Sequence, residues 1–135
     1  MPMIEVENLV KSFPTATGPE KLAVAGISFQ VSAGEIYGLL GPNGAGKTTT
    51  LRILSGLLQP TDGRTVINGI DVADDNRRVR HYIGFMTANT GLYQRLSPRE
   101  LLNYFADLNG LSPNVTRRRV EELIDWLGMA DFADL

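Results

Sequence analysis

The sequence predicts an α/β fold, and three features of the chain predict it. Apolar and polar residues alternate near the amino terminus, a glycine-rich loop separates a short apolar run from an amphipathic segment, and two capped segments with helical periodicity close the chain. Strand alternation followed by helical periodicity is typical of a sheet with helices packed on it. With 135 residues, 43% hydrophobic and 21% charged, the chain is suited to one ordinary domain with a real core.

Short strands are predicted where apolar and polar residues alternate. The first covers residues 4–13 and is followed by a loop with Pro, Gly and Thr over residues 14–20. A second covers residues 27–31, and residues 65–72 form a hairpin because their Asn-Gly pair suits a type I′ turn. Residues 35–40 are a mostly apolar run, which predicts a buried strand leading into the glycine-rich loop.

The glycine-rich loop reads GPNGAGKT at residues 41–48, the spacing G-x-x-x-x-G-K-[ST]. Its glycines let backbone N–H groups approach an anion without interference from Cβ atoms. Lys47 can reach the β- and γ-phosphates, and the Thr48 hydroxyl is placed to ligate Mg²⁺. The helix that follows adds its free N–H groups and the positive end of its dipole. The loop therefore predicts a triphosphate cradle, against the alternative of a glycine-rich turn with an exposed lysine.

Helices are predicted after this loop and in the last third of the chain. Apolar residues at helical spacing follow the loop and predict a helix, which ends before Pro60. Residues 74–81 form a short polar helix, and its arginines favour a solvated face over a specific anion site. Ser97 begins a helix with a capping box that Gly110 ends, and residues 112–127 form the last helix. Another buried strand is predicted over residues 82–87.

Composition excludes several classes of function. The net charge of −2 and pI of about 5.3 predict no general affinity for nucleic acid. The chain has no cysteine, which excludes disulfides and thiolate metal sites, and His81 is its single histidine, which excludes a multi-histidine site. We identify no signal peptide and no apolar run long enough to span a bilayer.

Residues 27–49 resemble one family, the ATP-binding subunits of ABC transporters. The family's loop typically reads GPNGAGKTT, as residues 41–49 do, and it follows a stretch similar to ISFQVSAGEIYGLL at residues 27–40. The resemblance extends over essentially the whole chain. It implies an α/β fold with a P-loop NTPase core, an antiparallel β-subdomain and the start of a helical subdomain. The expected partial nucleotide-binding domain covers residues 1–135, with residues 97–135 beginning the helical subdomain after the β-subdomain and P-loop core of residues 1–96.

By this resemblance the cofactors are ATP and Mg²⁺, and Phe13 stands where the family places an aromatic that stacks on adenine. Core packing at a strand end is the alternative for Phe13. The predicted binding residues are Phe13, Asn43, Gly44, Ala45, Gly46, Lys47, Thr48 and Thr49, with Thr48 also the Mg²⁺ ligand. The implied partners are a second nucleotide-binding domain and a multi-span transmembrane subunit, with no nucleic acid. The implied location is cytoplasmic, at the inner face of the cell membrane through that subunit.

The sequence departs from the family pattern at two places. Ala88 stands where the family usually has a glutamine, with Asn89 one residue later as a possible substitute, and this altered loop resembles the NatA-type subunits of sodium-extruding exporters. The chain also ends at Leu135, before the places of the signature motif, the Walker B aspartate and the switch histidine. We therefore expect that the C-terminal half of the domain is absent. No catalytic residue is predicted, and binding without turnover is expected of this chain alone.

The resulting prediction is ATP binding as the motor subunit of an ABC-type exporter, with hydrolysis coupled to transport in the intact protein. Two alternatives remain open from the sequence. One is a soluble ABC-type ATPase in translation or DNA repair, against which the modest negative charge argues weakly. The other is a truncated nucleotide-binding or interaction module without activity. Co-purification with a membrane subunit would distinguish the exporter prediction from both alternatives. Nucleotide binding would test the alternative of a module without activity.

Overall fold

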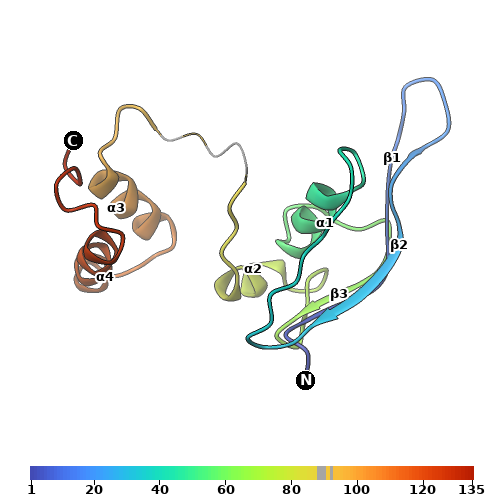
Figure 1. Cartoon of the computed structure of the whole chain (residues 1–135), viewed down its shortest axis with the longest axis horizontal. Helices are drawn as coiled ribbons and strands as arrows, with labels where there is room; N and C mark the ends of the chain where they lie inside the picture. Colours follow the sequence, from blue (N-terminus) through green and yellow to red (C-terminus); the bar gives the residue numbers. More distant parts are fainter. Residues whose placement is uncertain (88–90, 92) are drawn as a thin grey trace. The chain divides into compact units, whose positions relative to one another are not determined.

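The computed structural model describes residues 1–87, 91 and 93–135, and it consists of two compact units (Figure 1). The first unit is Met1–Met86 and the second is Thr87–Leu135. The predicted division into residues 1–96 and 97–135 is a family assignment, and it stays a prediction. None of the helices in the described residues is long and apolar enough to cross a membrane.

The first unit is built on a four-stranded antiparallel sheet with the order β2-β1-β3-β4. Its strands are β1 (Ile4–Phe13), β2 (Lys21–Val31), β3 (Asp62–Ile67) and β4 (Ile70–Asp71). β1 and β2 form a long hairpin that Figure 1 shows rising away from the rest of the sheet. β2 begins earlier than the alternation predicted, because Lys21 already pairs with Phe13 at the end of β1. The antiparallel strands and the short polar helix confirm the α/β prediction for this part of the chain.

A β-bulge in β1 explains a break in its alternation. Val6 and Leu9 are both buried although they are three residues apart. Between them Asn8 has a φ of 46°, and the pairing with β2 shifts register at this point. An extra residue in one strand turns the following side chains to the other face. The Asn8 N–H is satisfied by the Ser28 hydroxyl at 2.8 Å, so the bulge carries no lost hydrogen bond there.

Two helices cover one face of the sheet and enclose the core. They are α1 (Lys47–Leu54) and α2 (Asn76–Val79), the latter continued by the 3₁₀ helix η1 (Arg80–Tyr82). α1 is shorter than predicted because Gly56, with a φ of 69°, ends it ahead of Pro60. The predicted hairpin is confirmed, with Asn68 and Gly69 at φ values of 48° and 73° between β3 and β4. The buried core residues are Val6, Leu9, Val24, Ile53, Leu54, Ile67, Val72 and Val79.

Two strand predictions are wrong. Residues 35–40 and 83–87 form no strand, and residues 80–82 are helical instead. Ile36 and Leu40 are 99% and 96% exposed, and Met86 is exposed as well. An apolar run becomes a buried strand only where neighbouring strands bond its backbone and another layer covers it. Among the described residues no strand pairs with either segment, so these apolar segments lack the neighbouring strands that would make them part of a sheet.

The second unit is a helical hairpin of α3 (Pro98–Leu108) and α4 (Pro113–Trp126). Ser97 and Glu100 form the predicted capping box: the Ser97 N–H donates to Glu100 Oε2 at 2.8 Å, and the Glu100 N–H donates to Ser97 Oγ at 3.3 Å. Gly110, at a φ of 69°, ends α3 as predicted. The small core contains Val120, Ile124 and Ala133, with Leu102 and Met129 packed against it.

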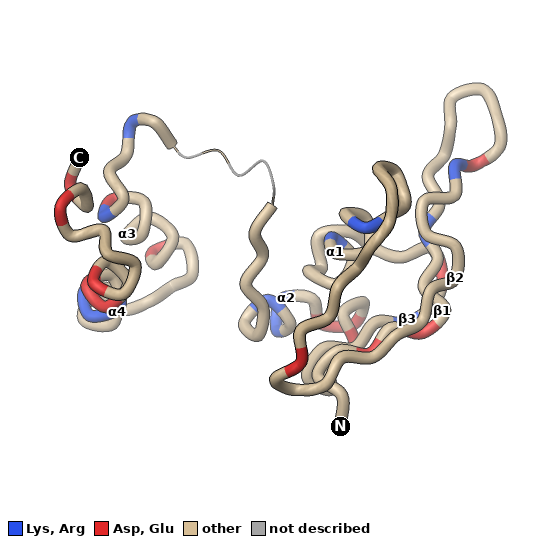
Figure 2. The backbone as a smooth tube through the Cα atoms, in the orientation of Figure 1, with Lys and Arg blue, Asp and Glu red and all other residues tan. Residues whose placement is uncertain are grey.

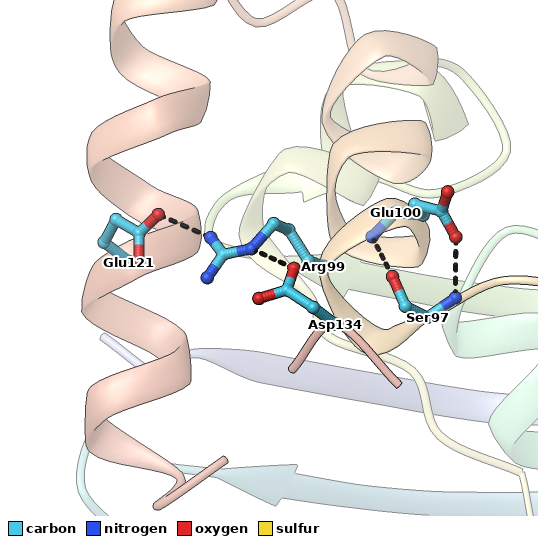
Figure 3. Close-up of polar contacts among 5 residues, drawn as sticks. All are labelled: Ser97, Arg99, Glu100, Glu121 and Asp134. Carbon is cyan, nitrogen blue, oxygen red and sulfur yellow. Dashed lines mark hydrogen bonds and ion pairs between the residues drawn. The ribbon is translucent and has the colours of Figure 1, made fainter. Parts of the chain in front are cut away.

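Arg99 ties three parts of this unit together (Figure 3). Its guanidinium donates to Glu121 on α4 at 2.5 Å and to Asp134 in the last turn at 2.7 Å. The hydrogen bonds and charges of Asp134 and Glu121 raise the pKa of Arg99. The Arg99 N–H also donates to the Ala133 carbonyl at 2.9 Å. These contacts hold the carboxyl-terminal turn against both helices.

The two helix N-caps of this unit provide a matched pair for measuring the capping box. Ser97→Ala should destabilise the helical unit by about 1 kcal/mol, because the Glu100 N–H loses its acceptor. Ser112→Ala should cost about 0.5 kcal/mol or less, since the Ser112 side chain makes no cap hydrogen bond. Urea unfolding followed by far-UV circular dichroism measures both. Equal losses from the two variants would contradict the capping assignment.

Candidate phosphate-binding site

The glycine-rich loop docks on the sheet through Gly46. Gly46 has a φ of 86° and is the N-cap of α1, and a Cβ built on it would lie 2.3 Å from the Ala23 carbonyl oxygen of β2. Only glycine fits both the left-handed backbone and this close approach. Gly44 also has a positive φ, 84°, but nothing lies within 4 Å of its Cβ position. The two glycines therefore serve different needs, close packing at Gly46 and backbone conformation at Gly44.

The loop presents a set of free backbone donors. Within residues 1–87, the amides of Asn43, Gly44 and residues 46–49 donate to no protein acceptor. The Ala45 N–H donates to the Pro42 carbonyl. Three of these amides form the first turn of α1, where the positive end of the helix dipole lies. Converging free N–H groups of this kind suit the oxygens of a phosphate chain.

The Lys47 ammonium lies back over the loop. It donates to the Gly41 carbonyl at 2.5 Å and to the Pro42 carbonyl at 2.7 Å. These bonds keep the ammonium beside residues 41 and 42, at the start of the loop. A point charge with rotatable donors on a flexible stem can exchange such carbonyls for phosphate oxygens.

Two threonines on the first turns of α1 have different roles. The buried Thr50 hydroxyl donates to the Gly46 carbonyl at 3.0 Å and so closes the helix end. Thr48 is exposed and borders the cavity described next. A hydroxyl ligand beside phosphate oxygens and waters fits the octahedral oxygen shell of Mg²⁺. The described residues hold no cluster of three or more carboxylate, imidazole or thiolate groups that could bind a metal by themselves.

A cavity of about 330 Å³ extends from the loop to the end of the β1–β2 hairpin. Phe13 borders this cavity with 38% of its surface exposed and is not one of the buried core residues. The Lys11 ammonium lies 5.1 Å from the centre of this ring. The full lining is Phe13, Lys21, Leu22, Ala23, Asn43, Gly44, Ala45, Gly46, Lys47, Thr48 and Thr49.

All eight predicted binding residues thus border one cavity, although Phe13 is far from the loop in sequence. Sequence reasoning missed three lining residues, Lys21, Leu22 and Ala23, because the alternation that marked β2 starts only at Ile27. No signal in the sequence marks them, because they reach the cavity only through the register that pairs Phe13 with Lys21. Ala88 and Asn89, where the family glutamine was considered, lie outside the described residues.

The arginines around α2 lie away from the cavity, and one of them, Arg80, bonds to the backbone after α1. Figure 2 shows basic residues gathered on this short helix. Arg80 donates to the Gly56 carbonyl at 3.4 Å, and Asp75 caps the helix by accepting from the Arg78 N–H at 3.0 Å. None of these arginines borders the cavity at the loop. The preferred prediction of a short polar helix agrees with this arrangement.

The G-x-x-x-x-G-K-[ST] loop and the helix that begins at Lys47 define the P-loop class of α/β proteins. Within that class the chain belongs to the ABC transporter family, whose model matches residues 24–135. The expected family and fold are confirmed by this match and by the solved structures that the chain resembles.

The relatives and the structural neighbour agree on the class. The ABC transporter ATP-binding protein NatA of Bacillus subtilis is 40% identical over 111 residues, which is 82% of this chain and 45% of NatA. ABC transporter A family member 7 of Arabidopsis thaliana is 40% identical over 120 residues, 88% of this chain and 13% of that protein. A dimeric ATP-binding cassette solved in a post-hydrolysis state with ADP and Pi has a TM-score of 0.78 at 25% identity, covering 98% of this chain and 60% of that one. The chain therefore spans less than two thirds of each.

The two loop glycines allow a direct test of the docking at Ala23. Gly46→Ala should destabilise the first unit by about 1–3 kcal/mol more than Gly44→Ala does. The reason is that the Cβ at position 46 meets the Ala23 carbonyl, which cannot move away freely. Both variants carry the same left-handed strain, so the difference isolates the contact. Denaturant unfolding of the two proteins measures it. Equal stability would show that the loop is not held by this approach.

Proposed function

We propose that this chain binds MgATP and forms the ATP-binding part of an ABC transporter's motor subunit. The observation that carries the proposal is that the residues with free amides, Asn43, Gly44 and residues 46–49, border one cavity together with the Lys47 side chain. This combination of donors and charge suits a triphosphate better than a neutral ligand.

In this proposal the base of the nucleotide lies at the other end of the cavity. Phe13 offers an exposed ring there, and Leu22 adds apolar surface beside it. An aromatic ring stacks on a nucleobase through its face, which gives affinity without demanding one hydrogen-bond pattern. Thr48 would hold the Mg²⁺ ion, which neutralises charge on the β- and γ-phosphates when it is bound.

The residues described around the cavity support binding and orientation of the nucleotide rather than its hydrolysis. Lys47, Thr48 and the loop amides position the phosphate chain and stabilise its charge. The lining contains no carboxylate or imidazole that could orient an attacking water. We therefore assign hydrolysis to the whole protein, in which further residues would complete the site.

For the whole protein we propose coupling of ATP hydrolysis to export across a membrane. Its partners would be a second nucleotide-binding domain and a multi-span transmembrane subunit, with no role for nucleic acid. Its place would be cytoplasmic, at the inner face of the cell membrane through that subunit. The 40% identity to NatA supports an exporter of the NatA type.

Removal of the Lys47 charge tests the proposed function. Lys47→Ala should weaken binding of inorganic triphosphate and of ATP by about 100-fold, because the protein loses the ammonium that would make charge-assisted hydrogen bonds to phosphate oxygens. Isothermal titration in the presence of Mg²⁺ measures both ligands. The protein should keep its circular dichroism spectrum, since the Lys47 ammonium is hydrogen-bonded to the Gly41 and Pro42 carbonyls of the exposed loop and not to the core.

The matched control is Lys21→Ala, which removes the same charge from the far end of the cavity. It should lower triphosphate affinity by about fivefold or less, since a surface charge at a distance is screened by salt. A folded Lys47→Ala protein with unchanged affinity would overturn the phosphate-site assignment. Equal losses from both variants would indicate general charge attraction instead.

The base end of the cavity has a test of its own. Phe13→Ala should weaken ATP binding by about 1–3 kcal/mol while leaving inorganic triphosphate nearly unaffected, because only ATP loses a stacked base. Titration of the same protein with each ligand gives the comparison. If both ligands lose equal affinity, Phe13 packs the hairpin and does not contact the base.

A further inference from the structure

The end of β1 that carries Phe13 is fastened by a side chain from outside the sheet. The pairing of β1 with β3 ends at Val10 and Asp62, so the Ser12 N–H beyond it has no strand partner on that side. The Thr61 hydroxyl takes this place and accepts from the Ser12 N–H at 3.0 Å. The Thr61 N–H donates to the Val10 carbonyl at 2.8 Å, which fixes the backbone of Thr61 against the same strand.

Ser12 is held from its side chain as well. Its hydroxyl contacts Glu20, which stands just before β2, and it lies 3.4 Å from the Thr61 hydroxyl. Ser12 itself pairs with Leu22 across the hairpin. The residue directly before Phe13 is therefore bonded through its N–H and its hydroxyl, and the ring position follows from a backbone that is fixed on both sides.

Thr61 belongs to the segment that leaves the phosphate loop's own helix. α1 begins at Lys47 and ends at Leu54, and the chain then turns and reaches Thr61 immediately before β3. β2 is meanwhile held to the loop by the close approach of Gly46 to Ala23. The hairpin end is thus tied to the loop and helix twice, by Gly46 through β2 and by Thr61 through β1. These two ties set the span between the Phe13 ring and the phosphate donors.

We propose that Thr61 is a positioning residue for nucleotide binding, whose hydroxyl holds the Phe13 ring at the separation from the loop that a nucleoside triphosphate requires. The inference rests on the proposed function. Thr61 does not border the cavity, so its effect passes through Ser12 to Phe13. It should therefore act on the base and leave the phosphate chain alone.

The test compares Thr61→Val, which removes the hydroxyl but keeps the shape, with Thr61→Ser, which keeps the hydroxyl. Thr61→Val should weaken ATP by about fivefold, the usual effect of one hydrogen bond, and change inorganic triphosphate less than about twofold. Thr61→Ser should bind both ligands as the unchanged protein does. Isothermal titration with Mg²⁺ gives the affinities, and circular dichroism confirms that each variant is folded.

A double-mutant cycle separates positioning from a general effect on stability. In a Phe13→Ala background, Thr61→Val should no longer change ATP affinity, because the ring it positions is gone. Ser28→Ala is the control, since it removes a hydroxyl that accepts from a β1 amide, that of Asn8, at the bulge away from Phe13. It should lower stability without changing the ratio of ATP to triphosphate affinity.

Each outcome bears on one assignment. If the unchanged protein binds neither ligand, the proposed function fails and this inference with it. If it binds both, and Thr61→Val lowers both affinities equally or acts equally in the Phe13→Ala background, Thr61 is structural only and the inference is wrong. An unchanged ATP affinity in Thr61→Val overturns it in the same way.

Discussion

The close approach of Gly46 to the Ala23 carbonyl is the constraint on which the rest of the first unit depends. It sets the N-terminus of α1 against β2, and with it the direction in which the helix runs over the sheet. Ile53 and Leu54 then reach the core formed by β1 and β3. One backbone contact therefore fixes how the helix packs on the sheet.

Local signals in the sequence predicted local structure well. The capping box at Ser97, the Asn-Gly turn at Asn68 and the helix ends at Gly110 each depend on residues within a few positions of one another. The conformation of the glycine-rich loop is local as well, because its positive-φ glycines and the bonds of Lys47 lie within residues 41–47. The phosphate site at this loop stays a prediction. Such local features can be predicted because the residues whose interaction stabilises them are close together in the sequence.

Features that depend on distant partners were predicted less well. Residues 35–40 and 83–87 have the composition of buried strands, but strand formation needs neighbours that their own sequence does not specify. The bulge at Asn8 accommodates the backbone of Gly63, where an added Cβ would lie 2.3 Å from the Asn8 carbonyl oxygen. No local pattern in β1 predicts this bulge. Lys21 joins the cavity only through hairpin register, which a short run of alternation does not fix.

The bonds of Lys47 to the Gly41 and Pro42 carbonyls have a consequence for selectivity. An arriving anion does not meet a bare cation, because the ammonium already has two acceptors. Binding is therefore an exchange of acceptors. It is favoured only by the difference between the interaction free energy of the ammonium with the anion and that with the two carbonyls. A weakly basic, singly charged ion such as chloride gains little from that exchange, whereas a polyphosphate brings more charge and several oxygens at once. Under the proposed function, this exchange would therefore favour a polyphosphate over a singly charged ion at the loop.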